Sequence, residues 1–430
     1  MSISCGVAGS TLTITNAAQA LGLRACPTYT GTIAVATSYQ GELGISGVKH
    51  ITESLDASSA PMLTAFESMD LESISSSLSI SSLTAIANIS FPALLSVPVL
   101  TLNNLGPVLS AVNFTSINGG NVTFQQTWIE KLDATSFQPT TLDNLVITQN
   151  HELVLVDLSS LTGSVGSIVI SQNVGSPDVN LSNVNAVSNT LFLNQISSVD
   201  LSSVSITGSV SISQSSITDL TLSELSAVNT LAVDNNAALT KLSLPHLQTI
   251  SGTPNSTNPA LSIANNTLLT GEIPLPVVTS IAGNASLVGT FYSISLPQLA
   301  SFQTVMTLQS TQDINSTCQY FSGMSSGSPT GGKLVPGGVN CIFPGSAPAP
   351  PKQEHSFKYL GAAIGTILGF LIVLAAIVGF VLRARHRRTA KEIEARKELA
   401  RNMRKREKDR SRARKWPGYG DPLSGQGGYV

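Results

Sequence analysis

The sequence predicts a mainly β protein: a right-handed parallel β-solenoid, followed by one transmembrane helix and a basic, partly helical tail. Three observations predict it. A short apolar strand recurs at intervals of about 20 to 24 residues, an uncharged apolar run covers residues 359–382, and arginines gather directly after that run. The chain therefore divides into a repeat region at 1–343, a short Pro-rich stalk at 344–358, the span itself and a tail at 383–430.

Charge differs sharply between the two sides of the apolar run. Residues 1–358 hold seven basic and nineteen acidic residues, whereas residues 383–430 hold sixteen basic and six acidic residues. A segment so poor in charge and so rich in Ser, Thr and Asn stays soluble through uncharged polar groups, and often through glycans.

The repeat is a strand whose last apolar residue, here called the anchor, comes before polar residues, as in LTLNN and LVITQN. Nine anchors follow one another: Ile80, Leu102, Phe124, Ile147, Ile170, Leu193, Ile212, Val233 and Ile263. A second apolar element lies between them, as at Leu242, Leu244 and Leu247. This period matches leucine-rich repeats and parallel β-helices and is too short for helical repeats. Each repeat should form one coil, with like residues stacked about 4.8 Å apart.

Asparagine recurs near the ends of these strands, at Asn104, Asn150, Asn173, Asn194, Asn235 and Asn265. Two interpretations fit this pattern. The asparagines could form a buried ladder that hydrogen-bonds backbone groups of the turns, or each could be a turn residue that adopts a left-handed backbone. The sequence favours neither over the other.

Four cysteines lie in the repeat region, with Cys5 and Cys26 near one end and Cys318 and Cys341 near the other. An even number in an exported chain favours disulfides, and proximity favours pairing within each end. Because the open ends of a solenoid need covering, each disulfide is expected to hold a cap. No CxxC spacing or adjacent histidine indicates a zinc site.

The run from Tyr359 to Leu382 is long enough to cross a bilayer as a helix. The positive-inside rule then places the tail in the cytoplasm and the N-terminus outside. The same basic residues are expected to contact anionic lipid, which makes nucleic acid an improbable partner, and the tail is expected to be disordered after about residue 416. The basic residues next to the span are Arg383, Arg385, Arg387 and Arg388.

Eight N-x-Ser/Thr sequons all precede the span, as expected for a glycosylated region outside the cell. They begin at Asn88, Asn113, Asn121, Asn180, Asn255, Asn265, Asn284 and Asn315. Export also needs a signal, and residues 1–26 lack the basic and apolar regions of a signal peptide. We expect either a missing upstream segment or a span that itself acts as the insertion signal.

These features resemble a known family, the fungal GPI-type cell-wall organisation and sporulation-specific surface proteins with receptor-L-domain-like repeats. Cys5 and Cys26, followed by YTGTI at residues 29–33, are similar to the family's opening. LPHLQTISG at residues 244–252 is similar to its recurrent turn, with partial copies at 296–299 and 91–94. The resemblance implies a role in cell-wall organisation without catalytic residues. This chain differs from the family in one respect. A GPI signal ends in its hydrophobic tail, whereas a basic segment follows the span in this chain.

Enzymes that cleave polysaccharides also adopt parallel β-helices and use paired carboxylates. Four aspartates recur near the ends of repeats, where a turn aspartate is the ordinary explanation: Asp157, Asp178, Asp200 and Asp219. The five histidines have no metal-binding spacing: His50, His151, His246, His355 and His386. Trp128, the one tryptophan before the span, has no aromatic companion near it in sequence. We therefore predict no enzyme, and no catalytic, cofactor or metal site.

Two functional hypotheses remain. The first is a structural, adhesive glycoprotein of the cell wall whose polar face contacts wall glycans or surface proteins. The second is a receptor or wall-stress sensor that binds a glycan or protein ligand outside and signals through the basic tail. Deleting the tail should abolish a sensor's function but not a structural protein's.

Overall fold

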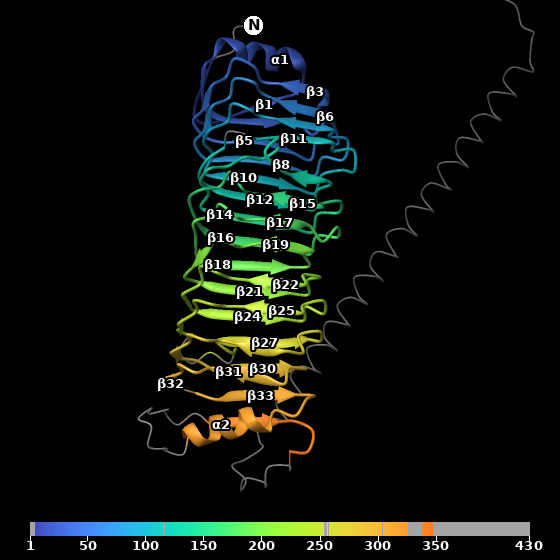
Figure 1. The fold of residues 1–430 in the computed structure, drawn as a ribbon. Helices are drawn as coiled ribbons and strands as arrows, with labels where there is room; N and C mark the ends of the chain where they lie inside the picture. Colours follow the sequence, from blue (N-terminus) through green and yellow to red (C-terminus); the bar gives the residue numbers. More distant parts are fainter. Residues whose placement is uncertain are drawn as a thin grey trace, which may run out of the picture. The chain divides into compact units, whose positions relative to one another are not determined.

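A computed structural model of the protein describes residues 5–114, 117–252, 256, 258–302, 304–325 and 338–346. They form a parallel β-solenoid of about 13 turns with an α-helix at each end (Figure 1). The predicted mainly β solenoid is confirmed. Its right-handed winding stays a prediction, which rests on the general handedness of parallel crossover connections.

The longest strands of successive coils stack into one parallel sheet, here called the long sheet, which runs along the whole solenoid. Its strands are β1 (Gly6–Ile14), β2 (Thr28–Val35), β5 (Leu55–Ser58), β8 (Ser77–Ser81), β10 (Val99–Asn103), β12 (Asn121–Gln125), β14 (Asn144–Thr148), β16 (Ser164–Ser171), β18 (Ala186–Asn194), β21 (Ser209–Ser213), β24 (Thr230–Asp234), β27 (Leu261–Asn266), β30 (Ala285–Gly289), β33 (Met306–Ser310) and β34 (Val339–Ile342).

Shorter strands form two further faces, and the chain crosses both before it begins the next long strand. The second face holds β3 (Gln40–Gly44), β6 (Met62–Glu67), β9 (Asn88–Ser90), β11 (Ala111–Asn113), β13 (Lys131–Leu132), β15 (Leu155–Asp157), β17 (Asp178–Asn180), β19 (Ser198–Asp200), β22 (Asp219–Thr221), β25 (Lys241–Ser243), β28 (Glu272–Pro274) and β31 (Ser293–Ser295). The third face holds β4 (His50–Ile51), β7 (Ser73–Ile74), β20 (Ser205–Ile206), β23 (Ala227–Val228), β26 (Thr249–Ile250), β29 (Ser280–Ile281) and β32 (Ser301–Phe302).

The core is built from the anchors predicted by the repeat. Along each long strand buried residues alternate with outward ones, which is the pattern of a strand with one buried face. Each anchor lies in register with the anchor of the next coil, as Ile147 does between Phe124 and Ile170. The column is continuous from Ile80 to Ile263.

One residue just after or at the end of most long strands turns the chain with a positive φ. These residues are Ser59, Ser82, Asn104, Gln126, Gln149, Gln172, Gln195, Gln214, Asn235 and Asn265. Their φ values lie in the left-handed region, which asparagine adopts more readily than most residues. The turn interpretation is therefore correct for Asn104, Asn235 and Asn265, and the buried-ladder interpretation does not hold for these three.

The residue after this turn carries the buried ladder. Asn150 and Asn173 occupy it, each with 1% of its surface exposed. The Asn173 side-chain oxygen accepts hydrogen bonds from the backbone N–H and the side-chain amide of Asn150, both at 3.0 Å. Its own amide donates to the Ile147 carbonyl at 3.1 Å. The ladder interpretation is thus correct for Asn150 and Asn173.

Two asparagines of this ladder were not predicted. Asn236 and Asn266 lie one residue beyond the asparagines named from the sequence, and Asn266 accepts from the Asn236 backbone N–H at 2.9 Å. Asn194 belongs to neither group, because it ends β18 and donates to Ser213 and Gln214 of the next coil. The side chain of the left-handed turn residue points outward, whereas the side chain of the next residue points inward. This difference in direction separates the turn role from the ladder role.

Both ends of the described solenoid carry a helix and a disulfide. At the N-terminal end α1 (Ala17–Gly22) follows β1, and the Cys5–Cys26 disulfide closes the first coil. At the other end Ile314, directly before α2 (Asn315–Ser325), and Phe321 within it are buried, and Cys318 of α2 is bonded to Cys341 of β34. These are the pairings predicted from the sequence. The helices cover apolar coil ends that would otherwise face water.

Several sequence predictions fall on residues outside this description. They are the stalk at 344–358 beyond Ser346, the span at 359–382, the tail with its four arginines, His355, His386 and the sequon at Asn255. No helix within the described ranges is long and apolar enough to cross a membrane.

Candidate functional site

The outward face of the long sheet is an uncharged polar surface over its middle coils. In the described strands from β8 to β21, every outward residue is uncharged, as Thr101, Thr123 and Ser211 illustrate. Not all of these residues are polar, since the exposed Val99 begins β10 and three apolar residues lie near the centre. Val146, Val169 and Phe192 are direct neighbours on successive strands. Hydroxyl and amide groups around a small apolar stripe suit contact with an uncharged polar partner.

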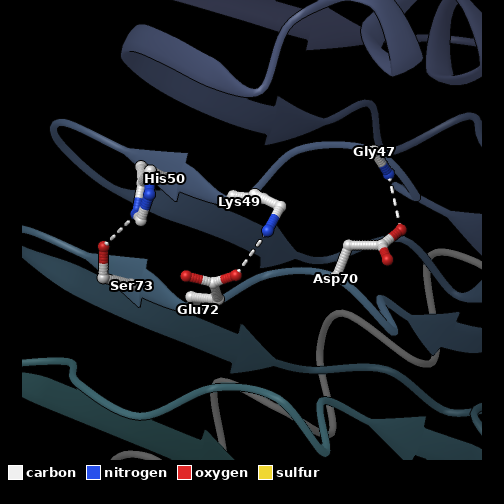
Figure 2. Close-up of polar contacts among 6 residues, drawn as sticks. All are labelled: Gly47, Lys49, His50, Asp70, Glu72 and Ser73. Carbon is white, nitrogen blue, oxygen red and sulfur yellow. Dashed lines mark hydrogen bonds and ion pairs between the residues drawn. The ribbon is translucent and has the colours of Figure 1, made fainter.

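Charged residues gather instead on the third face of the N-terminal coils (Figure 2). The Lys49 ammonium contacts the Glu72 carboxylate at 2.8 Å, and the Gly47 N–H donates to Asp70 at 2.8 Å. The His50 ring lies 2.9 Å from the Ser73 hydroxyl. The hydrogen bond and positive charge of Lys49 lower the pKa of Glu72. Each contact joins residues one coil apart, so this cluster holds neighbouring coils together. The acidic and basic groups of the residues drawn all take part in these contacts.

All four aspartates weighed as catalytic carboxylates accept hydrogen bonds from neighbouring groups. Asp219 accepts one from the Thr218 hydroxyl at 3.0 Å. Asp157 and Asp200 each accept the backbone N–H two residues later, at 3.0 Å, as turn aspartates do. Asn180 lies between them in the strand register, so they are two coils apart. Asp178 accepts from Ser197 and Ser198 at 2.6 Å, and these hydrogen bonds lower its pKa. No metal-binding cluster occurs among the described residues.

A further acid, Asp234 on β24, is half-buried. Its carboxylate accepts hydrogen bonds from the Ser262 hydroxyl and the Ala264 N–H, both at 2.8 Å. Burial nevertheless raises the pKa of Asp234 above its ordinary value of 3.8. The folded state therefore prefers the protonated acid, and stability should fall as the pH rises through the unfolded and then the folded pKa.

We expect Asp234→Asn to raise the midpoint of thermal unfolding at pH 7, because asparagine keeps the acceptor oxygen without the buried charge. The gain should shrink as the pH falls toward 3.8, where more than half of the native carboxyl is protonated because its pKa is raised above that value. Scanning calorimetry from pH 3 to pH 8 measures it. Glu224→Gln, at an exposed position, is the matched control. An equal gain at every pH would show that burial of this charge is not the cause.

Trp128 has an aromatic companion after all. Its ring stacks on that of His151 from the next coil, with centroids 4.6 Å apart and planes 24° from parallel. The expectation of a lone tryptophan is therefore wrong, because residues 23 apart in sequence lie side by side in the solenoid. His151 and His246 are exposed.

The described sequons lie mainly away from the middle of the long sheet. Asn88, Asn113 and Asn180 are on the second face, and Asn315 begins α2. Asn121 is the first residue of β12, at the edge of the long sheet. Exposed sequons are Asn121, Asn265 and Asn315, whereas the other described ones are partly buried. Glycans at these positions would leave the central outward columns of the long sheet open.

Comparison with known proteins places the fold in a biological context. Protein ecm33 of Aspergillus fumigatus is 27% identical over 324 residues, which are 75% of this chain and 78% of that protein. A cell surface GPI-anchored protein of Arthroderma benhamiae is 27% identical over 305 residues, 70% of this chain and 76% of that protein. The chain's relatives are fungal cell surface proteins. The cell surface GPI-anchored protein ECM33 of Candida albicans is a further, shorter match, 26% identical over 193 residues, 44% of this chain and 46% of that protein.

This relationship to Ecm33-type proteins confirms the family resemblance seen in the repeats and cysteines. No family model and no solved structure matches the chain.

Sequence reasoning missed the surface that combines the Trp128–His151 pair with the neighbouring glutamines. The repeat itself contained the signal for this surface, because residues one period apart come together when the coils stack. Adding one period to Trp128 gives His151, and adding one to Gln126 gives Gln149. Each pair meets only when coils are stacked in register.

Proposed function

We propose that this chain is a non-enzymatic cell-surface glycoprotein that contributes to cell-wall organisation and integrity, and that its repeat region also serves adhesion. The observation that carries the proposal is the uncharged, hydroxyl- and amide-rich outward face of the long sheet. Such a face offers many hydrogen bonds to wall glycans or surface proteins without attracting charged partners. The Ecm33-type relatives, named as fungal cell surface proteins, support the location.

The mode of attachment is part of the proposal. Residues 359–382 would anchor the chain with its N-terminus outside, and the arginines from Arg383 would contact anionic lipid inside. Two of the relatives are named as GPI-anchored, which is the alternative attachment. An epitope before Cys5, another after Val430 and phosphatidylinositol-specific phospholipase C distinguish them. A retained C-terminal epitope and resistance to the phospholipase support the helix.

Deleting the gene in its fungal host should make cells hypersensitive to wall-perturbing dyes, and the full chain should restore resistance. Growth on a dilution series of such a dye measures both. N-glycosidase treatment of the complementing protein should shorten it on a gel, since the sequons lie outside the cell. A deletion strain with normal resistance and normal wall composition would contradict the proposal.

The alternative is a receptor or wall-stress sensor, for which the basic segment after the span is the specific observation. A chain truncated after Arg388 keeps the stop-transfer arginines and removes the rest of the tail. Full rescue by the truncated chain supports a structural role, and loss of rescue with normal surface abundance supports a sensor.

A further inference from the structure

The middle outward residues of the long strands form a column, here called the central column, that carries no charge from β8 to β34. Each member is in register with the next: Ser79, Thr101, Thr123, Val146, Val169, Phe192, Ser211, Ala232, Ser262, Ser286, Thr307 and Asn340. Residues 1–358 as a whole hold nineteen acidic and only seven basic residues. Two copies of this region therefore repel each other, and they do so least where an uncharged face meets an uncharged face.

Two further outward columns flank the central column, and both are uncharged from β8 to β21. In β14 the flanking residues are Asn144 and Thr148, and in β21 they are Ser209 and Ser213. A two-fold axis running along the solenoid, in front of the central column, exchanges the two flanks. It brings Asn144 of one copy opposite Thr148 of another, and each such pair combines groups that donate and accept hydrogen bonds.

The same axis brings every residue of the central column opposite its own counterpart. Val146, Val169 and Phe192 are direct neighbours there and are only partly covered by their own chain. Facing the same three residues of a second copy would take them out of water. A charge at any of these positions would meet a like charge, because a two-fold contact joins identical patches. The lack of charge in this column thus fits contact with a second copy.

The uncharged face is large enough for a specific contact. Its strands from β8 to β21 stack directly above one another (Figure 1). Seven strands at about 4.8 Å, each with five residues at about 3.3 Å, give roughly 550 Å² on each copy. Two copies would cover about 1,100 Å² together, above the roughly 1,000 Å² that a specific interface needs. Among the described sequons only Asn121 falls on these strands, at the margin of the face.

We propose that the long sheet packs face to face against the long sheet of a second copy of this chain, with the two solenoids parallel. Two sheets packed in this way lie about 10 Å apart with interdigitating side chains. Parallel solenoids keep both C-terminal ends on the same side, as two chains anchored through residues 359–382 in one membrane require. Anchoring also raises the effective concentration of one copy near the other. This inference rests on the proposed function and names the surface protein that the face contacts.

The first test measures the mass of the glycosylated full chain, purified in detergent from cells that export it, by sedimentation velocity over a concentration series. The unchanged protein should be a dimer. Val169→Lys places like charges opposite each other on the axis and should raise the dissociation constant about tenfold or more. Val154→Lys, the same change at an exposed position directly before β15, should leave the dimer intact. So should Gly365→Leu, which removes the Gly361–Gly365 spacing that favours helix contact within a membrane.

A glycan placed on the face gives a second, independent way to separate the copies. Val169→Asn creates an N-x-Ser sequon with Ile170 and Ser171, and its glycan should keep two faces apart. Glu224→Asn creates a sequon with Leu225 and Ser226 at an exposed position outside the long sheet and should not affect the dimer. Treatment with N-glycosidase should restore association of the first variant at least in part.

Cross-linking tests the predicted axis. All four native cysteines form disulfides, so an introduced cysteine supplies the only free thiol. A short bismaleimide should join two copies of Val169→Cys but not two copies of Val154→Cys. Asn144→Cys and Thr148→Cys should cross-link efficiently when mixed and poorly when each is alone, because the axis brings these two positions opposite each other.

A protein that stays monomeric at every concentration would overturn the inference, and so would a dimer that survives Val169→Lys. A monomer whose face binds wall glycans would also overturn it and make a glycan the partner. The deletion strain tests the wall role separately. A wall phenotype with a monomeric protein contradicts only this inference, whereas a dimer without any wall phenotype contradicts only the proposed function.

Discussion

Asn173→Ala should lower the free energy of unfolding by about 3 to 5 kcal/mol, because it leaves several buried polar groups without partners. The Asn150 N–H and the Ile147 carbonyl both lose the hydrogen bonds that Asn173 provides. Water cannot replace them easily, since Asn150 and Asn173 are 1% exposed. Denaturant unfolding gives the free energy, and hydrogen exchange should show faster exchange at the Asn150 amide.

Asn104→Gly is the matched control for this prediction. Asn104 has the left-handed backbone that glycine adopts freely, and its side chain is exposed. We expect a change of at most about 0.5 kcal/mol there. If Asn173→Ala were no more destabilising than this control, the inner amide ladder would not hold the coils together.

Replacing Cys5 and Cys26 together by alanine should cost about 3 kcal/mol, since the disulfide closes a loop with a sequence separation of 21 residues. The first coil should fray, because a solenoid coil contacts only its neighbours and, among the described strands, β1 pairs with β2 alone. Hydrogen exchange should therefore rise in β1, α1 and β2 and stay unchanged in the middle coils.

The opposite cap supplies the control. Alanine at Cys318 and Cys341 should raise exchange in β33, α2 and β34 while leaving the N-terminal coil protected. Uniform loss of protection along the solenoid in either variant would mean that the disulfides stabilise the whole domain rather than its ends.

The repeat, its period and the columns of the core could be predicted from the amino-acid sequence. The anchors from Ile80 to Ile263 could be named because a strand buried on one face must alternate, and a stacked coil must repeat the alternation at one period. The disulfide pairing was predictable as well, since each cysteine pair lies within about one coil.

Which asparagine of each turn faces inward became clear only in the folded solenoid. Asn235 and Asn236 are adjacent and identical in type, yet one turns the chain in the left-handed conformation and the other joins the buried ladder. The backbone conformation of the turn fixes that direction, and residue type alone does not reveal it, since both positions hold asparagine. The same holds for Trp128 and His151, whose rings meet only because stacking in register brings positions one period apart into contact.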